Sequence, residues 1–371
     1  MKKIIGAILT LSLILTQFSV FAQNSDINSE QKIYNISLND AVNMAYEENA
    51  QIEANLLKQK GNKVNLSVAR ISKREAKNIT ANVSSGFELY CVKNGYYVKA
   101  SEMALRISEM ESEKIKANIA YNVTQSYYNL VLMQKLLNAA ENSYELALGN
   151  KKAVDAQYEL GLIPELDFQN ADVTVKLCEN ALNEYKLNYE IAEQNLKILI
   201  HKDQENCTIV PTDEIECEEY ISNSEEDIKN ALETRFDLSS LKENRNLSEE
   251  YFNCAKAGGE GSAIYNTAYA SFMEADYNYT NTRKLIALSV KSQYNTIITS
   301  SAKMETARMQ YEIDLKEYEA AKLKYELGMI ANLELTKCIN DLYTSQVNYA
   351  NAKLNYRLAV EKYKYEITIG L

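Results

Sequence analysis

The hexapeptide Tyr-Glu-Leu-Gly-Met-Ile at residues 325–330 occurs a second time, as Tyr-Glu-Leu-Gly-Leu-Ile, at residues 158–163. We call the separation between Tyr158 and Tyr325 the repeat offset. It also relates positions well outside the hexapeptide, for example Tyr127 and Tyr294. Self-similarity at so large a separation indicates a duplicated structural unit. Each glycine ends one long helical pattern and precedes another, so each hexapeptide is predicted to be a helix-reversing turn.

The composition favours long helices and excludes one class of partner. The chain has 371 residues, of which only 2 are proline and 11 are glycine, and its formal net charge is -11. So little proline, in a chain rich in good helix formers, is typical of uninterrupted helices. The acidic balance, with no basic stripe, argues against nucleic acid as a partner.

The N-terminus has the three parts of a secretory signal. Two lysines are followed by an apolar run over residues 4–20, and Ala22 completes a small-residue cleavage site. Residues 1–22 are therefore predicted to be a signal peptide and 23–36 a flexible leader. A membrane anchor that is never removed is the alternative. Export places the protein in the outer membrane if the host has one, and otherwise at an extracytoplasmic surface.

Apolar positions spaced three and four residues apart indicate long helices in both halves of the chain. The clearest series lies within residues 168–199 and reappears after the repeat offset, and such a series is typical of a coiled coil. A first repeat is predicted at 37–200, a linker at 201–223 and a second repeat at 224–371. The predicted fold class is mainly all-α, built from duplicated long helical hairpins.

The opening helix of the first repeat has a recognisable start. Ser37 is a predicted N-cap with Asp40 three residues later, and the apolar pattern continues to about Lys77.

The counterpart of this opening helix in the second repeat lies further along the chain than the repeat offset predicts. There Ile228 and Ala231 match Val42 and Ala45, and we call this larger separation the opening offset. Because the later helices keep the repeat offset, the second copy has lost residues between its first and second helices.

One stretch of the first repeat departs from the helical pattern. Residues 79–99 contain β-branched and aromatic residues on both sides of Asn94-Gly95, which is a strong hairpin signal. At most a small β-hairpin is therefore predicted near 79–99, with an irregular connection between helices as the alternative. In the linker, residues 208–210 could form a short strand.

No catalytic or metal-binding arrangement is recognisable in the sequence. His201 is the single histidine and lies at a predicted helix end, where capping or solvation is its expected role. One histidine excludes nucleophile–histidine pairs and most histidine-based metal sites. The chain is therefore predicted to be no enzyme and to use no cofactor or metal.

The 6 cysteines show no metal-ligand spacing. Cys207 and Cys217 lie in one irregular segment and are the only plausible disulfide pair at the level of sequence, with free thiols as the alternative.

These features together resemble the TolC-like outer membrane efflux family. The resemblance rests on the signal peptide, the opening motif at 38–45, the motif Tyr-Tyr-Asn-Leu at 127–130, the two glycine turns and the closing helix over 356–370. It covers residues 36–370. The family implies a homotrimer whose hairpins form a hollow helical tunnel, working with a periplasmic adaptor (membrane fusion protein) and an inner-membrane pump.

The resemblance also assigns a role to the two glycine turns. By position, they would contact the adaptor through Gly161, Leu162, Asp167, Gly328 and Met329. The alternative is that these residues only shape the turns. Members of this family also have β-strands at the end opposite the glycine turns. A membrane-spanning pair of strands needs about twenty residues plus a turn. The short stretches available here predict reduced or missing strands.

The predicted function is a passive exit duct with efflux transporter activity. A helical envelope scaffold without a pore, or an adaptor-like binding protein, is the alternative, because the same helical body serves either role. A secreted coiled-coil protein that stays monomeric is a third interpretation. Oligomeric mass and channel conductance discriminate among the three.

Overall fold

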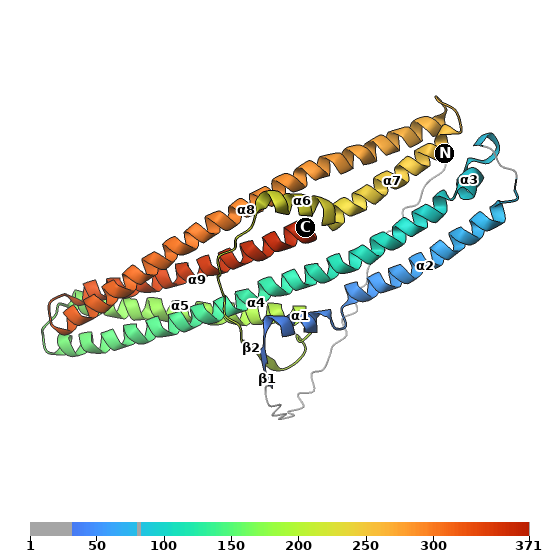
Figure 1. The fold of residues 1–371 in the computed structure, drawn as a ribbon. Coiled ribbons are helices and arrows are strands. Elements are labelled where there is room, and N and C mark those ends of the chain that lie inside the picture. The colour runs from blue at the N-terminus through green and yellow to red at the C-terminus, as the bar shows by residue number, and fades with distance from the viewer. Residues whose placement is uncertain (1–31, 80–82, 371) are drawn as a thin grey trace, which may run out of the picture.

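The computed structural model describes residues 32–79 and 83–370, which form an elongated and almost entirely helical body (Figure 1). The predicted signal peptide, residues 1–22, and most of the predicted leader lie outside the described residues. In chain order the elements are β1 (Lys32–Ile36), α1 (Leu38–Tyr46), α2 (Ala50–Ala76), α3 (Val83–Asn94), α4 (Tyr96–Glu159), α5 (Glu165–Leu199), β2 (Cys207–Pro211), α6 (Ser224–Thr234), α7 (Phe236–Lys256), α8 (Ala263–Glu326) and α9 (Asn332–Thr368).

Two helices of 64 residues each, α4 and α8, form the frame of the molecule. At 1.5 Å per residue, each is about 96 Å long. One half of α4 packs against α5 and the other half against α2, while α8 packs against α9 and α7 in the same way (Figure 1). The predicted fold class, mainly all-α with duplicated long hairpins, is confirmed.

The two repeats lie side by side. Helix α4 of the first repeat contacts both α9 and α7 of the second. Along the contact with α7, Arg106 Nη2 lies 2.6 Å from Glu243 Oε2, and Lys99 Nζ lies 2.6 Å from Glu250 Oε1. Exposed ion pairs contribute at most about 1 kcal/mol, so apolar burial stabilises the contact between the repeats more than these pairs do.

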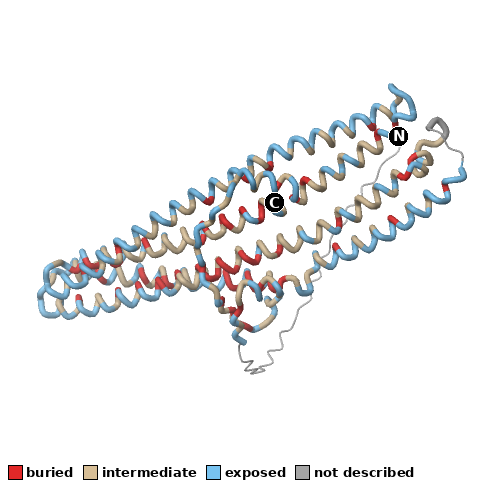
Figure 2. Tube along the Cα trace, viewed as in Figure 1, coloured by how far each residue is buried: buried red, intermediate tan, exposed pale blue. Residues whose placement is uncertain are grey.

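The buried residues are concentrated around the middle of the long helices (Figure 2). The largest cluster joins α4 and α5 with α1 and the segment around β2, and it includes Val123, Tyr127, Leu130 and Leu196, all 0% exposed. Full burial of a large apolar side chain contributes about 1.5–3 kcal/mol. This cluster therefore fixes how the long hairpins are held together.

The duplication extends to individual hydrogen bonds in this core. The Tyr127 hydroxyl donates to the backbone oxygen of Ile36 at 2.9 Å. The Tyr294 hydroxyl donates to the backbone oxygen of Ser222 at 3.1 Å. Tyr294 is related to Tyr127 by the repeat offset, and Ser222 to Ile36 by the opening offset. Both separations found in the sequence therefore describe real structural equivalence.

The first repeat starts as predicted but with two helices instead of one. The Ser37 hydroxyl accepts the N–H of Asp40, and the Asp40 carboxylate accepts the N–H of Ser37, which completes a capping box at α1. The helical pattern expected to run on to about Lys77 is interrupted at Asn49. The side-chain oxygen of Asn49 accepts the N–H of Gln51 and so starts α2.

The short strands β1 and β2 form a parallel two-stranded sheet in which Tyr34 lies opposite Ile209. Strand β2 confirms the strand predicted over residues 208–210, and its buried residues alternate along the chain as in a half-buried strand. Strand β1 lies in the stretch predicted to be a leader. Its backbone is ordered because β2 supplies partners for its N–H and C=O groups.

The β-hairpin predicted near 79–99 does not form in the described residues. Residues 80–82 lie outside them, and α3 and the start of α4 occupy the rest. Asn94-Gly95 separates α3 from α4, and Gly95, with φ of 82°, is the N-cap of α4. One face of α3 packs against α7 through Phe87 and Cys91. Burial against a helix therefore outweighs the weak strand preference of these residues.

The corresponding end of the second repeat is also helical. Helix α7 continues to Lys256, and Ser262 caps α8 by accepting the N–H of Tyr265. Only the short turn between them is irregular. The strands implied by the family resemblance are thus missing from the described residues of this end, as the short stretches predicted.

Cys207 and Cys217, the only pair that the sequence offered for a disulfide, have different neighbours in the structure, which agrees with the alternative of free thiols. The Cys207 sulfur lies 4.0 Å from the backbone oxygen of Lys202, whereas the Cys217 thiol donates to the backbone oxygen of Lys353 at 3.5 Å. The segment between the two cysteines begins with the extended strand β2, which advances about 3.3 Å per residue. That extension separates two residues that looked close in the sequence.

Candidate functional site

Both helix-reversing turns lie at the same end of the elongated body (Figure 1). We call residues 158–168 the first tip and residues 325–335 the second tip. At the first tip, Gly161 has φ of 69°. The Leu162 N–H donates to the oxygen of Gln157 at 2.9 Å, and the Gly161 N–H donates to that of Tyr158 at 2.8 Å. This pair of bonds is the Schellman motif, which needs a residue in the left-handed region.

The second tip has the same geometry. Gly328 has φ of 69°, its N–H donates to the oxygen of Tyr325 at 2.9 Å, and the Met329 N–H donates to that of Lys324 at 2.8 Å. Every one of these groups follows its counterpart in the first tip by the repeat offset. The two predicted glycine turns are confirmed, including the positive φ that only glycine adopts without strain.

Each tip continues into a helix whose first turn is acidic. Asp167 lies in the first turn of α5, and Glu334 lies at the equivalent position of α9. The N-caps, Pro164 and Ala331, make no side-chain capping bond. A carboxylate near a helix N-terminus contributes about 0.3–1 kcal/mol through the helix dipole. These carboxylates therefore partly replace the missing caps.

Large apolar side chains are exposed on both tips. Leu162 and Met329 are 70% and 69% exposed. The full set, which we call the apolar tip patch, consists of three pairs related by the repeat offset: Leu160 and Leu327, Leu162 and Met329, Leu166 and Leu333. Clustered exposed apolar side chains typically mark an interaction surface.

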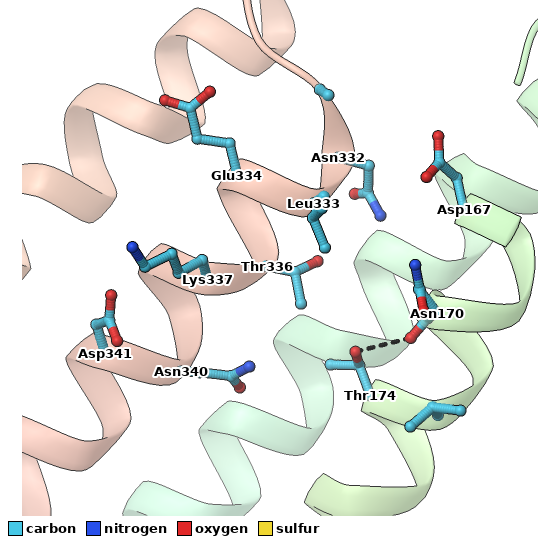
Figure 3. Close-up of a pocket in the computed structure, with 12 residues that line it drawn as sticks. Asp167, Asn170, Thr174, Asn332, Leu333, Glu334, Thr336, Lys337, Asn340 and Asp341 are labelled. Atoms are coloured by element: carbon cyan, nitrogen blue, oxygen red, sulfur yellow. Dashed lines mark hydrogen bonds between the residues drawn. The ribbon is translucent and has the colours of Figure 1, made fainter.

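A groove of about 810 Å³ separates the first turns of α5 and α9 (Figure 3). Asp167, Asn170 and Thr174 lie on its α5 side, facing Asn332 and Thr336 on α9. The remaining lining residues are Val173, Ala331, Leu333, Glu334, Lys337, Asn340 and Asp341. Most of the lining residues carry an amide, hydroxyl or carboxylate group, but apolar atoms make up more of the lining surface, so the groove suits a polar as well as an apolar contact.

One polar group in this groove is buried without a partner. Asn332 is 8% exposed, and its Oδ1 atom accepts no hydrogen bond from the described residues. Behind it, the Asn150 amide of α4 donates to the Thr336 hydroxyl at 3.2 Å, which ties the first repeat to the second at the tips. A buried oxygen without a donor costs free energy, so this atom is a local point of instability in the groove.

Lys151 holds the start of α5 against α4 behind the first tip. Its Nζ atom pairs with Asp155, lies 3.1 Å from Asp172 Oδ1 and lies 4.2 Å from the centroid of the Phe168 ring. The hydrogen bond to Asp155 raises the pKa of the Lys151 ammonium; desolvation opposes this effect, and the hydrogen bond to Asp172 adds a smaller increase. Phe168 also stacks on Tyr158, with 4.7 Å between ring centroids. These contacts fix the direction in which the first tip points.

The structure brings the five predicted contact residues to one end of the molecule. Four lie in the turns and one, Asp167, lines the groove; the turn residues are Gly161, Leu162, Gly328 and Met329. Sequence reasoning missed the other four members of the apolar tip patch and Asn332. The four leucines could have been found, because the repeat offset places an apolar residue at each equivalent position. Contact with an adaptor stays a prediction.

His201 is exposed just beyond α5 with φ of 58°, where it ends the helix. Within residues 32–79 and 83–370, no group of three or more His, Cys, Asp or Glu is placed to hold a metal ion. In the same part of the chain, every helix is too short or too polar to cross a lipid bilayer.

The positive φ at the tips leads to a first prediction. Gly328→Ala is expected to destabilise the fold by about 1–2 kcal/mol, because a Cβ disfavours the left-handed backbone. No atom lies within 4 Å of the added Cβ, so the backbone effect is isolated. Gly149→Ala, equally free of neighbours but inside α4, is the control and should stabilise by up to about 1 kcal/mol. Urea denaturation measures both, and changes of the same sign would contradict the proposed turn geometry.

Comparison with known families agrees with this fold. The family model described as outer membrane efflux protein matches residues 256–362, which include all of α8 and most of α9. The match therefore contains the second tip and leaves the first repeat outside. No curated protein matches the sequence.

Solved structures match nearly the whole chain. The Campylobacter jejuni CmeC outer membrane channel has a TM-score of 0.71 and 18% identity, covering 89% of this chain and 85% of that chain. The open state of the Neisseria gonorrhoeae MtrE outer membrane channel has a TM-score of 0.71 and 12% identity, with coverages of 90% and 89%. The Vibrio cholerae outer membrane protein VceC has a TM-score of 0.70 and 12% identity, with coverages of 90% and 96%. The resemblance to the TolC-like outer membrane efflux family is thus confirmed at the level of fold.

Proposed function

We propose that this chain is the protomer of a passive efflux duct in the cell envelope, an exit conduit of the tripartite type without catalytic activity. The observation that carries the proposal is the apolar tip patch, six exposed apolar side chains on two tips whose turns have the same hydrogen bonds. A surface of this kind at the end of a long helical body suits end-on docking. The fold shared with outer membrane channels supports the same function.

The proposed partner at the tips is a periplasmic adaptor (membrane fusion protein), which connects the duct to an inner-membrane pump. Gly161, Leu162, Asp167, Gly328 and Met329 are the proposed contacts. The groove between α5 and α9 has acidic and amide side chains next to exposed leucines. It therefore suits an amphipathic helical partner that carries hydrogen-bond donors beside its apolar face.

A second apolar surface supports assembly into a homotrimer. Helix α5 buries one face within the chain and exposes a stripe of apolar residues on the opposite face. The α5 stripe consists of Val173, Leu177, Leu187, Ile191 and Ile198. Successive members lie 4, 10, 4 and 7 residues apart, which keeps all five on one face of the helix. Stable association with a second copy of the chain would bury this stripe.

A different helix offers a surface for the other side of the same contact. On α8, large apolar side chains are also exposed, among them Leu288, Met309, Ile313 and Leu323. Two different surfaces on each protomer are what a closed ring with head-to-tail contacts requires. The ring would enclose a tunnel along the long helices.

A helical envelope scaffold without a pore is the second candidate. The observation in its favour is the helical end remote from the tips, where α3 and the start of α4 occupy residues 83–99. Both candidates include export, which the predicted signal peptide supports. They also share the proposed organisation of two repeats, 37–200 and 224–371, joined by the linker 201–223.

Conductance in planar lipid bilayers, together with light scattering, tests the proposal. A duct gives discrete channel steps and the mass of three chains. A scaffold gives the oligomeric mass with no steps. A monomeric mass without steps would overturn both candidates and favour the secreted monomer.

Charge placed on the tips tests the docking surface. Leu162→Asp combined with Met329→Asp is expected to abolish capture of the purified adaptor and to reduce efflux to the level of a strain without the duct. Thermal unfolding should not change, because both side chains are exposed and no charge is buried. Leu57→Asp, at a side chain that is 59% exposed on α2, is the matched control and should keep full capture. Undiminished capture by the tip variant would remove the tips as the docking site.

A further inference from the structure

At the end remote from the tips, α3 of the first repeat faces α7 of the second. The rings of Phe87 and Tyr251 meet edge to face, with 5.6 Å between centroids. Cys91 follows Phe87 by four residues on α3, and Cys254 follows Tyr251 by three on α7. Residues three or four apart share one face of a helix, so the ring contact also brings the two cysteines towards each other.

The two thiols lie close to each other. The neighbouring Cys254 thiol adds to burial in raising the pKa of the Cys91 thiol, and Cys91 is 1% exposed. The other described cysteines have different neighbours: Cys178 contacts the Ser143 hydroxyl, Cys207 the Lys202 oxygen, Cys217 the Lys353 oxygen, and Cys338 packs against Ala321, Leu335 and Ile339. Cys91 and Cys254 therefore stand out as the pair placed for a covalent bond.

We propose that Cys91 and Cys254 form a disulfide in the mature protein, which joins the two repeats covalently at the end opposite the tips. The inference rests on the export included in the proposed function, because disulfides persist in oxidising compartments outside the cytoplasm. A disulfide has a sulfur–sulfur distance of about 2 Å. The ring contact between Phe87 and Tyr251 already holds α3 against α7, so rotation of the two cysteine side chains on the facing surfaces can bring the sulfurs together.

The bond forms by thiol–disulfide exchange with an oxidised dithiol oxidase of the envelope. One cysteine thiolate attacks the oxidase disulfide and forms a mixed disulfide; the second thiolate then displaces the oxidase. The two cysteines lose two protons and two electrons in total, and the oxidase disulfide is reduced to a dithiol. Burial raises the pKa of the Cys91 thiol to about 12, so little thiolate exists in the folded protein at neutral pH. Oxidation is therefore expected before α3 and α7 pack together.

The crosslink would lie at the end of the molecule where the two repeats contact each other through exposed ion pairs and one aromatic cluster. Lys99 pairs with Glu250 and Arg106 with Glu243 at this end, and each pair is exposed. A bond between distant parts of the chain stabilises the fold chiefly by restricting the unfolded chain. It would hold the far ends of the two repeats together while leaving the tips free to dock.

Mass spectrometry of alkylated protein tests the bond in two settings. Protein from the cell envelope is denatured in N-ethylmaleimide without reductant, and the reduced chain is separately refolded in glutathione disulfide. In both, we expect a crosslinked peptide containing Cys91 and Cys254 and two fewer alkylated thiols than the 6 cysteines of the chain. Full alkylation of all cysteines after refolding, or a crosslink between Cys207 and Cys217 in its place, would overturn the proposal.

A matched pair of variants gives a second readout. Wild-type protein should unfold at a lower temperature after reduction, and Cys254→Ala should lose this dependence on reductant. Cys338→Ala, at a half-buried cysteine on α9, should keep it. The refolding experiment is independent of export and conductance. A crosslinked protein without channel steps would therefore overturn the duct alone, whereas a conducting trimer with free Cys91 and Cys254 would overturn the disulfide alone.

Discussion

Leu177→Glu combined with Ile191→Glu should convert the proposed trimer into a folded monomer. In the single chain these side chains are 62% and 58% exposed on the face of α5 opposite its buried face, so the substitutions leave the fold intact. In the trimer, each site would lose about 1.5–3 kcal/mol of apolar burial. Each would also bury a carboxylate without a partner, which costs still more. Light scattering should report the mass of one chain, and circular dichroism an unchanged helix content.

The control for this prediction is Ile221→Glu, outside α5. Ile221 is an apolar residue that is 84% exposed, and it lies in the segment between β2 and α6, away from the α5 stripe. The same added charge there should leave the trimer intact. If the stripe variant keeps the mass of three chains, α5 does not form the contact between protomers.

Among the single substitutions predicted for this chain, Glu366→Ala should cause the largest loss in the free energy of unfolding. Glu366 is 3% exposed, and its Oε1 atom lies 2.7 Å from Arg235 Nη1 and accepts the Ser289 hydroxyl at 2.6 Å. Arg235 is itself only 4% exposed. Breaking a buried ion pair by removing one partner costs about 3–5 kcal/mol, because the remaining charge stays desolvated. Asp237 still contacts Arg235, so Glu366→Ala is expected near the lower limit.

Glu305→Ala is the matched control for the buried pair. Glu305 also pairs with an arginine, Arg308, at 2.6 Å, but both side chains are about half exposed. An exposed pair contributes at most about 1 kcal/mol, so this variant should unfold in nearly the same urea concentration as the wild type. If Glu366→Ala and Glu305→Ala lose the same free energy of unfolding, burial does not decide the strength of the Arg235–Glu366 pair.

The elements that could be predicted from the sequence depend on interactions between near neighbours in the chain. Gly161 and Gly328 fit the left-handed region because they have no Cβ, and the Schellman bonds join residues at most five positions apart. The capping box of Ser37 and Asp40 is equally local. The spacing of apolar residues predicted the long helices, and the repeat offset paired the two tips.

The predictions that failed concerned contacts between distant segments. The residues around Phe87 have a weak preference for strands, but their conformation is decided by α7, which belongs to the other repeat. The sequence left open whether Cys207 and Cys217 pair, and the structure separates them because strand β2 extends the segment between them and pairs with β1. The groove at the tips was not predictable either, since Asp167 and Asn332 belong to different repeats.

The sequence by itself therefore determined the duplicated helical hairpins and the two glycine tips, because helix periodicity and backbone conformation at glycine are local properties. Only the tertiary structure decided which faces stay exposed, that α3 replaces a hairpin, and that Cys91 lies against Cys254. Those outcomes depend on which helix supplies the buried partner. Burial energies summed over a long helical interface exceed the fractions of a kcal/mol by which single residues prefer helix or strand.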